Sequence, residues 1–436
     1  MNAMWALLYR FVIGIARLAL PLFSRGDSKL ARGLEGRRHA LELLALWGES
    51  VRDPSRPTIW VHAPSVGEGH QAQSVVRALQ LLRPELQVVF TFFSPSAESL
   101  AHAFGADVAT YLPWDQKVPI SAALDAIHPD LVCFTKTEVW PVLVEEAERR
   151  GVPVSIVAAT VTKRSKRNRW FARTFLRPTW AKLSCVAANT EQDAKRISFL
   201  GVSRSAIRTT GDPGIDSALD RVRVADAESA CLAPFHADSR PTLVAGSTWP
   251  SDESVLLSAL GGVREAVPGL RVVIAPHEPE ERGISDLLGR LRADGWCVAT
   301  LAEVESTQTV RGVDVVVVER VGALAHLYSI ASVAYVGGGF HEMGLHSVLE
   351  PAASTVPVVF GPNHENARAA GDLLTAGGAI VANDVDELTG ALIRWFTSEE
   401  DRVRAGGAAF GYIERHQGAA DRTAALLDDL LQPARP

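Results

Sequence analysis

Short apolar runs alternate with amphipathic helical stretches along almost the whole chain. In the first half the runs are TIWVHAP, LQVVFTFFS, LVCFTKTE, VPVSIVAAT and LSCVAANT, which begin at residues 58, 86, 131, 152 and 183. Helical spacing separates them, as at Ala72, Val75, Val76 and Leu79. Because hydrophobicity is continuous within each run, the runs are typical of strands buried on both faces. The pattern therefore predicts a doubly wound parallel sheet with flanking helices.

The pattern breaks at residues 212–240, a polar and proline-bearing linker, and then restarts. TLVAGST, LRVVIAPHE, VDVVVVER, VAYVGGG, VPVVFGP and GAIVAND follow. We therefore expect an α/β protein with two Rossmann-like domains, residues 25–213 and 214–436, and we allow the last helix to pack back on the first domain. Such sheets bind ligands at the carboxyl ends of their strands, so we expect a central ligand cleft between the domains.

Residues 3–23, AMWALLYRFVIGIARLALPLF, are strongly apolar but contain Arg10 and Arg17. A signal peptide is disfavoured because its apolar core carries no arginine. A spanning helix would place an arginine in hydrocarbon, at a cost of roughly 2.5–3.5 kcal/mol. We therefore expect residues 1–24 to form an amphipathic anchor helix at the membrane interface, with Arg10 and Arg17 near anionic headgroups. A helix buried in the first domain is the alternative.

Length and composition agree with two globular domains. A chain of 436 residues exceeds what one core usually holds, and 47% hydrophobic residues suffice for two cores. The formal net charge of -6 argues against a protein that coats nucleic acid, and we expect no nucleic-acid partner. Cys133, Cys185, Cys231 and Cys297 form no C-x-x-C pair. Reduced thiols in the core, and a cytoplasmic compartment, are therefore favoured.

A glycine-rich segment follows one strand of the second half. Gly337, Gly338 and Gly339 lie between a predicted strand and a predicted helix. Glycine there lets a ligand approach the backbone, and the helix start attracts phosphate. Ser347 and Glu350 satisfy the S-x-x-E pattern of a capping box. We expect both interpretations to hold, so that the capped helix end and Glu350 contact the phosphate and ribose hydroxyls of a nucleotide.

Two further loops of the second half have the same position. Gly246, Ser247 and Thr248 separate a strand from a helix, and Pro276 and His277 end the next strand. A single histidine after a strand is more often an ordinary loop residue. Three such loops at one sheet edge nevertheless favour a nucleotide-phosphate site. The chain has neither a Walker lysine signature nor a complete G-x-G-x-x-G fingerprint, which disfavours kinases and dehydrogenases.

Two carboxylates follow strands in the first half, where both would face the cleft. Glu138 lies beside Trp140, whose ring can screen it from water, raise its pKa and make it a base. Glu68 lies in HAPSVGEGH, at the start of a predicted helix. A helix N-terminus favours the carboxylate anion and makes it a weaker base. From the residues alone, an ordinary first-turn acid is at least as well supported for Glu68 as a catalytic base.

Residues 163–182, KRSKRNRWFARTFLRPTWAK, form a basic segment with eight cations, four aromatic residues and no acid. A solvated helix face is the usual explanation of a charge run. The missing counter-charge and the interleaved aromatic residues instead favour binding of an anionic amphiphile, either a lipid or a phosphorylated glycolipid. The candidate contacts are Lys163, Arg164, Lys166 and Arg167.

Nine motifs occur in a fixed order along the chain. They are HAPSVGEGHQAQSVV, TFFSPSAES, YLPWD, KTEVWPVL, TGDPGID, AGSTWPSDE, IAPHEPE, YVGGGFHEMGLHSVLEPAA and VVFGPNHENAR. In order and spacing this set resembles the 3-deoxy-D-manno-octulosonic acid (Kdo) transferases over nearly the whole chain. The resemblance implies a GT-B fold and an inverting glycosyltransferase of lipopolysaccharide biosynthesis. Such an enzyme moves Kdo from CMP-Kdo to a lipid A precursor (lipid IVA) at the cytoplasmic face of the inner membrane.

The resemblance also implies roles for individual residues. Glu68, of S-V-G-E, is the general base that takes the proton from the acceptor 6′-hydroxyl, and Glu138, of T-E-V-W, is a supporting carboxylate. No metal or other cofactor is expected, because helix N-termini stabilise the leaving phosphate. The basic segment and the N-terminal arm would meet lipid A phosphates and anionic inner-membrane lipids. The expected CMP contacts are Pro276, His277, Val321, Gly322, Ala323, His346, Ser347, Val348, Leu349 and Glu350.

Three positions depart from the family pattern. Ser347 stands where many members have asparagine, His277 stands where many have arginine, and TGDPGID lacks the usual basic or aromatic residues before its final aspartate. These positions bear on donor affinity and on the donor sugar. Two other functions remain as alternatives: another GT-B enzyme, either an epimerase or an amino-sugar transferase, and a noncatalytic relative that binds anionic lipid or nucleic acid.

Overall fold

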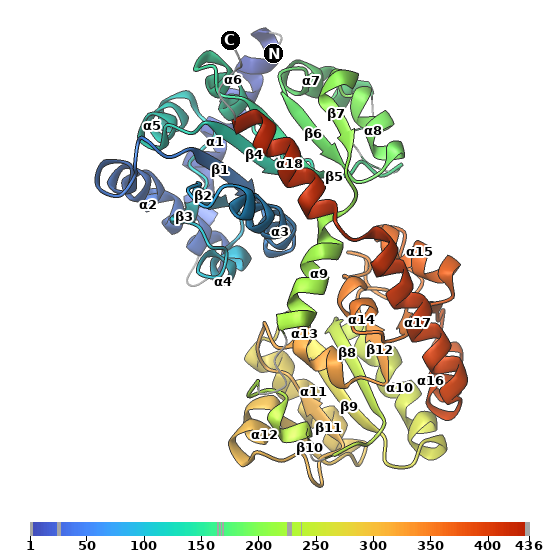
Figure 1. The fold of residues 1–436 in the computed structure, drawn as a ribbon. Coiled ribbons are helices and arrows are strands. Elements are labelled where there is room, and N and C mark those ends of the chain that lie inside the picture. Colours follow the sequence, from blue (N-terminus) through green and yellow to red (C-terminus); the bar gives the residue numbers. More distant parts are fainter. Residues whose placement is uncertain are drawn as a thin grey trace. The chain divides into compact units, whose positions relative to one another are not determined.

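The structure is a computed structural model that describes residues 3–23, 28–163, 165, 167, 170–224, 229–236 and 238–431. The chain divides into two compact units. Unit 1 comprises Met1–Ser217 with Gln417–Pro436, and unit 2 comprises Ala218–His416. The boundary falls within the helix α9, Pro213–Val224 (Figure 1). The interpretation of residues 212–240 as an irregular linker is therefore wrong in part, because Ile215, Ala218 and Leu219 are buried along this helix.

Unit 1 is built on a parallel seven-stranded sheet with the order β3-β2-β1-β4-β5-β6-β7 (Figure 1). Its strands are β1 Thr58–Ala63, β2 Gln87–Phe92, β3 Val108–Tyr111, β4 Leu131–Thr135, β5 Val154–Ala159, β6 Cys185–Ala188 and β7 Ile207–Thr209. Its helices are α1 Ala3–Phe23, α2 Lys29–Ser50, α3 Val66–Leu82, α4 Glu98–Ala101, α5 Lys117–Ile127, α6 Pro141–Arg149, α7 Trp170–Trp180, α8 Glu191–Ser198 and α18 Ala419–Leu431, with the 3-10 turns η1 Pro95–Ala97 and η3 Arg204–Ala206.

The inner strands of unit 1, β1, β2, β4, β5 and β6, are buried on both faces, as the continuous apolar runs predict. Ile59 and Val61 of β1 belong to a core cluster shared with α3 and α18, whereas Trp60 belongs to a second cluster shared with α2, α5 and α6. Successive side chains of a strand point to opposite faces, so one strand contributes to both cores. The sheet is therefore covered by helices on both sides, as a doubly wound fold requires.

Unit 2 repeats this architecture with the order β10-β11-β9-β8-β12-β13-β14. Its strands are β8 Thr242–Thr248, β9 Arg271–Pro276, β10 Val298–Thr300, β11 Val315–Val317, β12 Val333–Val336, β13 Val358–Phe360 and β14 Ala379–Val381. Its helices are α10 Pro250–Ala266, α11 Glu281–Ala293, α12 Leu301–Thr307, α13 Leu324–Leu327, α14 Leu349–Ala353, α15 Arg368–Ala376, α16 Val385–Thr397 and α17 Glu399–His416, with η4 Ala233–Phe235 and η5 Tyr328–Ile330. Val333 and Tyr335 of β12 join one core cluster and Ala334 joins the other.

Three strands carry no clear signal in the apolar pattern. These are β3, β7 and β10, and each lies at an edge of its sheet. An edge strand is covered less completely than a central one, so it needs no unbroken apolar run. In β7, for example, Arg208 and Thr209 are exposed.

The cysteines are unpaired, but one of them departs from the prediction. Cys133, Cys185 and Cys231 are buried free thiols, as expected. Cys297 is a free thiol that lies at the surface. The expectation of a core thiol is wrong there because Cys297 immediately precedes the edge strand β10, whose three residues are themselves only partly buried.

The N-terminal helix α1 contacts unit 1 through its polar side chains. The Tyr9 hydroxyl donates to Asp115 at 2.7 Å, Arg10 pairs with Glu145 at 3.3 Å, and Arg17 donates to Gln116 at 2.8 Å. Large apolar side chains are exposed elsewhere on this helix, namely Leu8, Phe11, Val12, Ile15, Leu18, Leu22 and Phe23. Among the described residues, no helix combines the length and apolarity needed to cross a bilayer.

The last helix, α18, returns to unit 1 and packs against α3. Leu427 is buried in the same core cluster as Val75 and Leu79, and Asp428 pairs with Arg83 of the α3 end. Asp216 accepts hydrogen bonds from the amides of Gly418 at 2.5 Å and Ala420 at 2.9 Å, which fixes the start of the helix.

The contact between α18 and α3 predicts which unit a C-terminal substitution weakens. Leu427→Ala should destabilise unit 1 by about 2–5 kcal/mol, the usual cost of deleting a buried leucine side chain. Hydrogen exchange followed by mass spectrometry should then show faster exchange in β1 and α3 but not in unit 2. The matched control is Leu392→Ala, at a buried position of α16, which should affect unit 2 instead. Faster exchange of unit 2 in the Leu427 variant would contradict the packing described.

Candidate functional site

The candidate catalytic residues lie where the strand order of unit 1 reverses. β1 is the first strand of the sheet, and its neighbours β2 and β4 lie on opposite sides of it. His62 of β1 is in register with Phe134 of β4, so the segments that follow these two strands leave the sheet side by side. Glu68 lies in the first turn of α3, and residues 136–140 connect β4 to α6. This switch point is where open α/β sheets bind ligands.

Glu68 is held by two partners. The Lys136 ammonium nitrogen lies 2.9 Å from its Oε1 atom, and the Ser65 hydroxyl donates to its Oε2 atom. The side chains of Glu68 and Lys136 are 19% and 38% exposed, so the ion pair remains accessible to a substrate. Lys136 adopts a left-handed backbone conformation with φ +59°, which is uncommon for a residue with a Cβ atom. Its amide donates to the Val157 carbonyl at 2.8 Å, and this bond holds the turn.

Glu138 occupies a different environment from Glu68, although the two carboxylates are close enough to interact. Burial raises the pKa of Glu138 above its ordinary value, the Arg167 guanidinium opposes this shift, and the negative charge of Glu68 adds to it. The expectation of a raised pKa is therefore confirmed. Arg167 also donates to the Thr137 carbonyl at 3.2 Å, which ties the basic segment to this loop.

A buried hydrogen-bond chain positions Trp140. The Trp140 indole nitrogen donates to His62 Nε2 at 3.1 Å, and His62 Nδ1 lies 3.1 Å from the Thr91 hydroxyl. Burial lowers the pKa of His62 to about 3, so its ring is neutral at physiological pH. The neutral ring accepts at Nε2 and therefore carries its proton on Nδ1. This chain fixes the loop on which Glu138 lies.

Asp115, in the YLPWD motif, connects α1 to the same loop. Its carboxylate accepts hydrogen bonds from the amides of Val142 at 3.0 Å and Leu143 at 2.9 Å, in the first turn of α6, and from the Tyr9 hydroxyl. Burial raises the pKa of Asp115 to about 6, although these three hydrogen bonds oppose the shift. The position of the N-terminal helix is thus linked to the helix that follows Glu138.

In unit 2 an aromatic cluster gathers at the carboxyl ends of three strands. Trp249 follows β8, His277 follows β9, and His341 and His346 follow β12. The rings of Trp249 and His341 stack with centroids 4.2 Å apart, and those of His277 and His346 with centroids 4.1 Å apart. Burial, with the nearby His277 ring adding to it, lowers the pKa of His346 to about 4. Thus the predicted residue His277 is part of a cluster, not an isolated loop residue.

The glycine run after β12 has a structural role that the sequence reasoning missed. The Gly338 amide donates to Asp252 at 2.8 Å, and the Phe340 amide donates to the other oxygen of the same carboxylate at 3.1 Å. A Cβ atom on Gly337 would collide with the backbone of Ser247, and one on Gly339 would collide with the backbone of Gly361. The glycines therefore allow neighbouring loops to pack closely. Asp252 accepts hydrogen bonds from two amides of this loop, those of Gly338 and Phe340.

The predicted continuation from Gly337–Gly339 into a capped helix is wrong. Residues 340–348 form a loop, and α14 begins only at Leu349 with Val348 at its N-cap. Ser347 accepts a hydrogen bond from the Leu349 amide at 3.3 Å, and no capping box forms. Glu350 instead pairs with Arg221 of α9 at 2.6 Å. Arg221, which is distant in the sequence, thus pairs with the Glu350 carboxylate that the S-x-x-E motif predicted to cap the helix.

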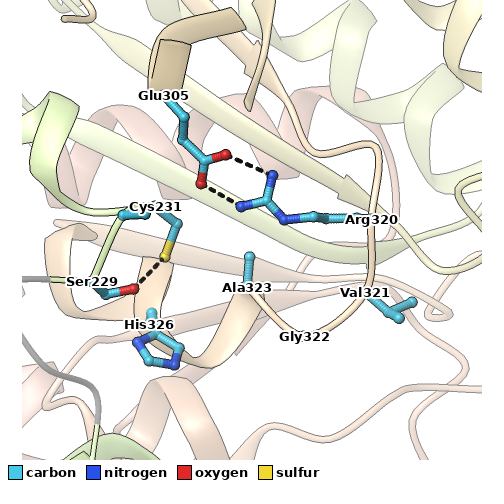
Figure 2. Close-up of a pocket in the computed structure, with 9 residues that line it drawn as sticks. Ser229, Cys231, Glu305, Arg320, Val321, Gly322, Ala323 and His326 are labelled. Atoms are coloured by element: carbon cyan, nitrogen blue, oxygen red, sulfur yellow. Dashed lines mark hydrogen bonds and ion pairs between the residues drawn. The ribbon is translucent and has the colours of Figure 1, made fainter. Parts of the chain in front are cut away.

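The other predicted donor residues of unit 2 lie at the carboxyl ends of β8, β9 and β11. Gly246, Ser247 and Thr248 end β8, and a Cβ atom on Gly246 would collide with the Tyr328 hydroxyl. Pro276 ends β9. Val321, Gly322 and Ala323 line a pocket of about 200 Å³ (Figure 2). Figure 2 shows Glu305 and Arg320 joined at one wall of this pocket, with Cys231 and His326 at the other.

The basic segment is only partly described. Lys163 and Arg167 belong to the described residues, whereas Arg164 and Lys166 lie outside them. Trp180, one of its aromatic residues, is a fully buried member of the unit 1 core. Trp170 is 79% exposed. The aromatic residues therefore divide between core packing and the surface.

Several site residues were missed from the sequence. Lys136 lies within the quoted TKTE stretch, and its position directly after a strand was the available signal. Asp252 lies in the first turn after β8, which is the same kind of position. The residues that the structure describes contain no group of three or more His, Cys, Asp or Glu side chains that could hold a metal ion.

The lowered pKa of His62 predicts a pH dependence of stability. The pKa is about 3 in the folded state and about 6.5 in the unfolded state, so its contribution is present above pH 6.5 and is lost as the pH falls towards 3. In urea unfolding between about pH 6 and 4.5, His62→Gln should reduce the slope of unfolding free energy against pH by up to about 1.4 kcal/mol per pH unit. The exposed control, His102→Gln, should keep the wild-type slope; equal slopes in both variants would refute this assignment.

Comparison with known proteins agrees with this geometry. Residues 39–217 match the family model described as 3-Deoxy-D-manno-octulosonic-acid transferase (kdotransferase). The 3-deoxy-D-manno-octulosonic acid transferase of Haemophilus influenzae is 28% identical over 404 residues, which are 91% of this chain and 91% of that protein. The enzyme of the same name from Bordetella pertussis is 29% identical over 397 residues, 88% of this chain and 90% of that protein.

A solved structure shares the fold. The crystal structure of UDP-GlcNAc 2-epimerase from Neisseria meningitidis bound to UDP-GlcNAc has a TM-score of 0.59 and 15% sequence identity, and the match covers 86% of this chain and 99% of that one. At this identity the likeness concerns the fold alone, which is the GT-B architecture predicted from the sequence. The family-model match and these relatives, similar along most of the chain, therefore support a 3-deoxy-D-manno-octulosonic acid transferase, which is a glycosyltransferase.

Proposed function

We propose that the protein transfers Kdo from CMP-Kdo to a lipid A precursor, lipid IVA, with inversion at the anomeric carbon. The observation that carries this proposal is the pair of interacting carboxylates, Glu68 and Glu138, at the switch point of unit 1. Similarity to Kdo transferases along most of the chain supports the donor sugar and a place in lipopolysaccharide biosynthesis. Unit 1 would supply the base and bind the acceptor, and unit 2 would bind the nucleotide.

Glu68 acts as the general base in this proposal. It takes the proton from the acceptor 6′-hydroxyl, whose oxygen forms a bond to the anomeric carbon of Kdo. The bond from that carbon to the CMP phosphate oxygen breaks, and CMP leaves with the electron pair. Glu68 is partly enclosed and hydrogen-bonded, which sets its orientation. The Lys136 ammonium group occupies the Oε1 atom of Glu68, so a further change must free this oxygen when the substrate binds.

Lys136 supplies that change. Kdo carries a carboxylate and the acceptor carries phosphates, and either anion can attract the partly exposed ammonium group away from Glu68. Movement of the ammonium group frees Oε1 to receive the proton at the moment the substrate is bound. Glu138, with its raised pKa, is the second carboxylate and can hold a proton close to the reacting hydroxyl.

The nucleotide would bind to the loops at the carboxyl edge of the sheet in unit 2. The pocket of about 200 Å³ beside Val321, Gly322 and Ala323 has room for a pyrimidine ring, and His326 Nδ1 is buried there with no hydrogen-bond partner among the described residues. The cluster of Trp249, His277 and His346 would contact the phosphate and the sugar. The expectation that transfer needs no metal stays a prediction.

The helix α1 is proposed to hold the enzyme at the cytoplasmic face of the inner membrane. Its exposed apolar side chains suit the interface between headgroups and acyl chains. Arg10 and Arg17 have polar partners in unit 1, so they attach the helix to the unit while the apolar side chains contact lipid.

The base is tested by Glu68→Gln, which preserves shape and removes the carboxylate. We expect a loss of transfer of at least about 10²-fold, the usual scale of general base catalysis. Binding of cytidine monophosphate, measured by thermal shift, should remain unchanged because the nucleotide site lies in unit 2. The matched control is Glu148→Gln at an exposed acid of α6, which should retain full activity. Near-normal transfer by the Glu68 variant would refute the proposed role.

The role of Lys136 is tested by substitutions that remove or keep its charge. Lys136→Met should lower kcat/KM by about tenfold or more, because the cation that attracts the substrate anion is removed. Lys136→Arg keeps the charge and should retain most of the activity. Equal losses of kcat/KM in the two variants would show that Lys136 has only a structural role.

A further inference from the structure

A groove lies at the outer edge of the sheet in unit 1, between α8 and the edge strand β7. Its volume is about 580 Å³. Glu191, Ala194, Lys195 and Ser198 line it from α8, and Arg204, Ile207, Arg208 and Thr209 line it from η3 and β7. None of these residues belongs to the catalytic or nucleotide-binding groups described above.

The groove carries an excess of positive charge. Three of its lining residues are cations and one is an acid. Within the described part of the chain, no carboxylate lies at ion-pair distance from Lys195, Arg204 or Arg208. Arg208 donates to the backbone carbonyls of Ser205 at 2.7 Å and Ile207 at 3.0 Å, and these bonds hold its guanidinium group in place. Uncompensated cations around one concave site suit an anion that accepts several hydrogen bonds.

One end of the groove adjoins an exposed apolar surface. Phe199 directly follows α8 and is 50% exposed, with the Arg173 guanidinium 5.3 Å from its ring. The Gly201 loop packs so closely on Arg177 of α7 that a Cβ atom would collide with it. The Phe175 ring of α7 lies 6.3 Å from the Tyr9 ring of α1. A continuous series of contacts thus joins the groove, through α7, to the helix with the exposed apolar side chains.

We propose that this groove binds the phosphate headgroup of an anionic membrane lipid. Phe199 and Trp170, both exposed, would lie at the level of the headgroups, where aromatic side chains are favoured. Lys195, Arg204 and Arg208 would surround the phosphate. The groove therefore gives unit 1 a second attachment to the bilayer, which fixes its orientation as well as its proximity. Unlike the apolar contact of α1, this attachment depends on lipid charge.

The test compares binding to vesicles of phosphatidylcholine alone with binding to vesicles that contain about 30% phosphatidylglycerol. The full-length wild-type protein should bind the anionic vesicles at least about tenfold more tightly, and Lys195→Glu with Arg204→Glu should abolish most of that difference. The control, Arg282→Glu with Arg292→Glu on α11 of unit 2, makes the same change of net charge at exposed residues and should lose less than about twofold. Lys195→Gln with Arg204→Gln is a milder variant that should show an intermediate loss.

Three results would overturn the proposal. One is an equal loss in the groove and control variants, which would show nonspecific attraction. Another is a wild-type protein without preference for phosphatidylglycerol. The third is a loss of inorganic phosphate binding in the groove variants with their vesicle binding unchanged, which would identify a free-phosphate site. The vesicle assay measures no turnover, so its outcome is independent of the proposed transfer reaction. Transfer to a detergent-dispersed acceptor should be unchanged in the groove variants.

Discussion

The parallel pairing of β1 with β4 is the constraint on which the candidate active site depends. β1 pairs with β2 along one edge and with β4 along the other. The segments that follow β1 and β4 therefore run apart and leave a binding position between them. The register of His62 with Phe134 then fixes which residues meet there. Glu68 and Lys136 are far apart in the sequence, and their ion pair exists only because these two strands are adjacent. Unit 2 uses the same device at β8 and β12, where Asp252 receives the amides of the glycine-rich loop.

Two carboxylates at one switch point have different surroundings. Glu68 has a cation and a hydroxyl as partners, whereas Glu138 is largely buried, and burial raises its pKa. The buried chain from Trp140 through His62 to Thr91, together with the Asp115 contacts, keeps the second carboxylate in place. The same Asp115 accepts a hydrogen bond from Tyr9 of the N-terminal helix, so this helix and the candidate active site share a structural support.

The sequence predicted the central strands, the two-domain α/β architecture and the position of Glu68, because each depends on a local pattern. Continuous apolar runs reveal a strand that is buried on both faces, and they fail for β3, β7 and β10 because an edge strand is less covered. The capping box at Ser347 and Glu350 failed because Arg221, which is distant in sequence, satisfies the carboxylate. Lys136 was missed for the same reason, since a lysine after a strand has no local feature that identifies its partner. The glycine run was correctly located, but its cause, the close packing of three loops, requires the tertiary structure.

The proposed reaction transfers Kdo from a cytidine donor to a lipid acceptor. It is tested most directly by mass spectrometry of the lipid after the purified full-length protein is incubated with CMP-Kdo and a tetraacyl lipid A precursor. The lipid should gain the mass of one or more Kdo residues, and free CMP should appear in equal number. An unchanged lipid under conditions in which the protein is folded and binds cytidine monophosphate would contradict it.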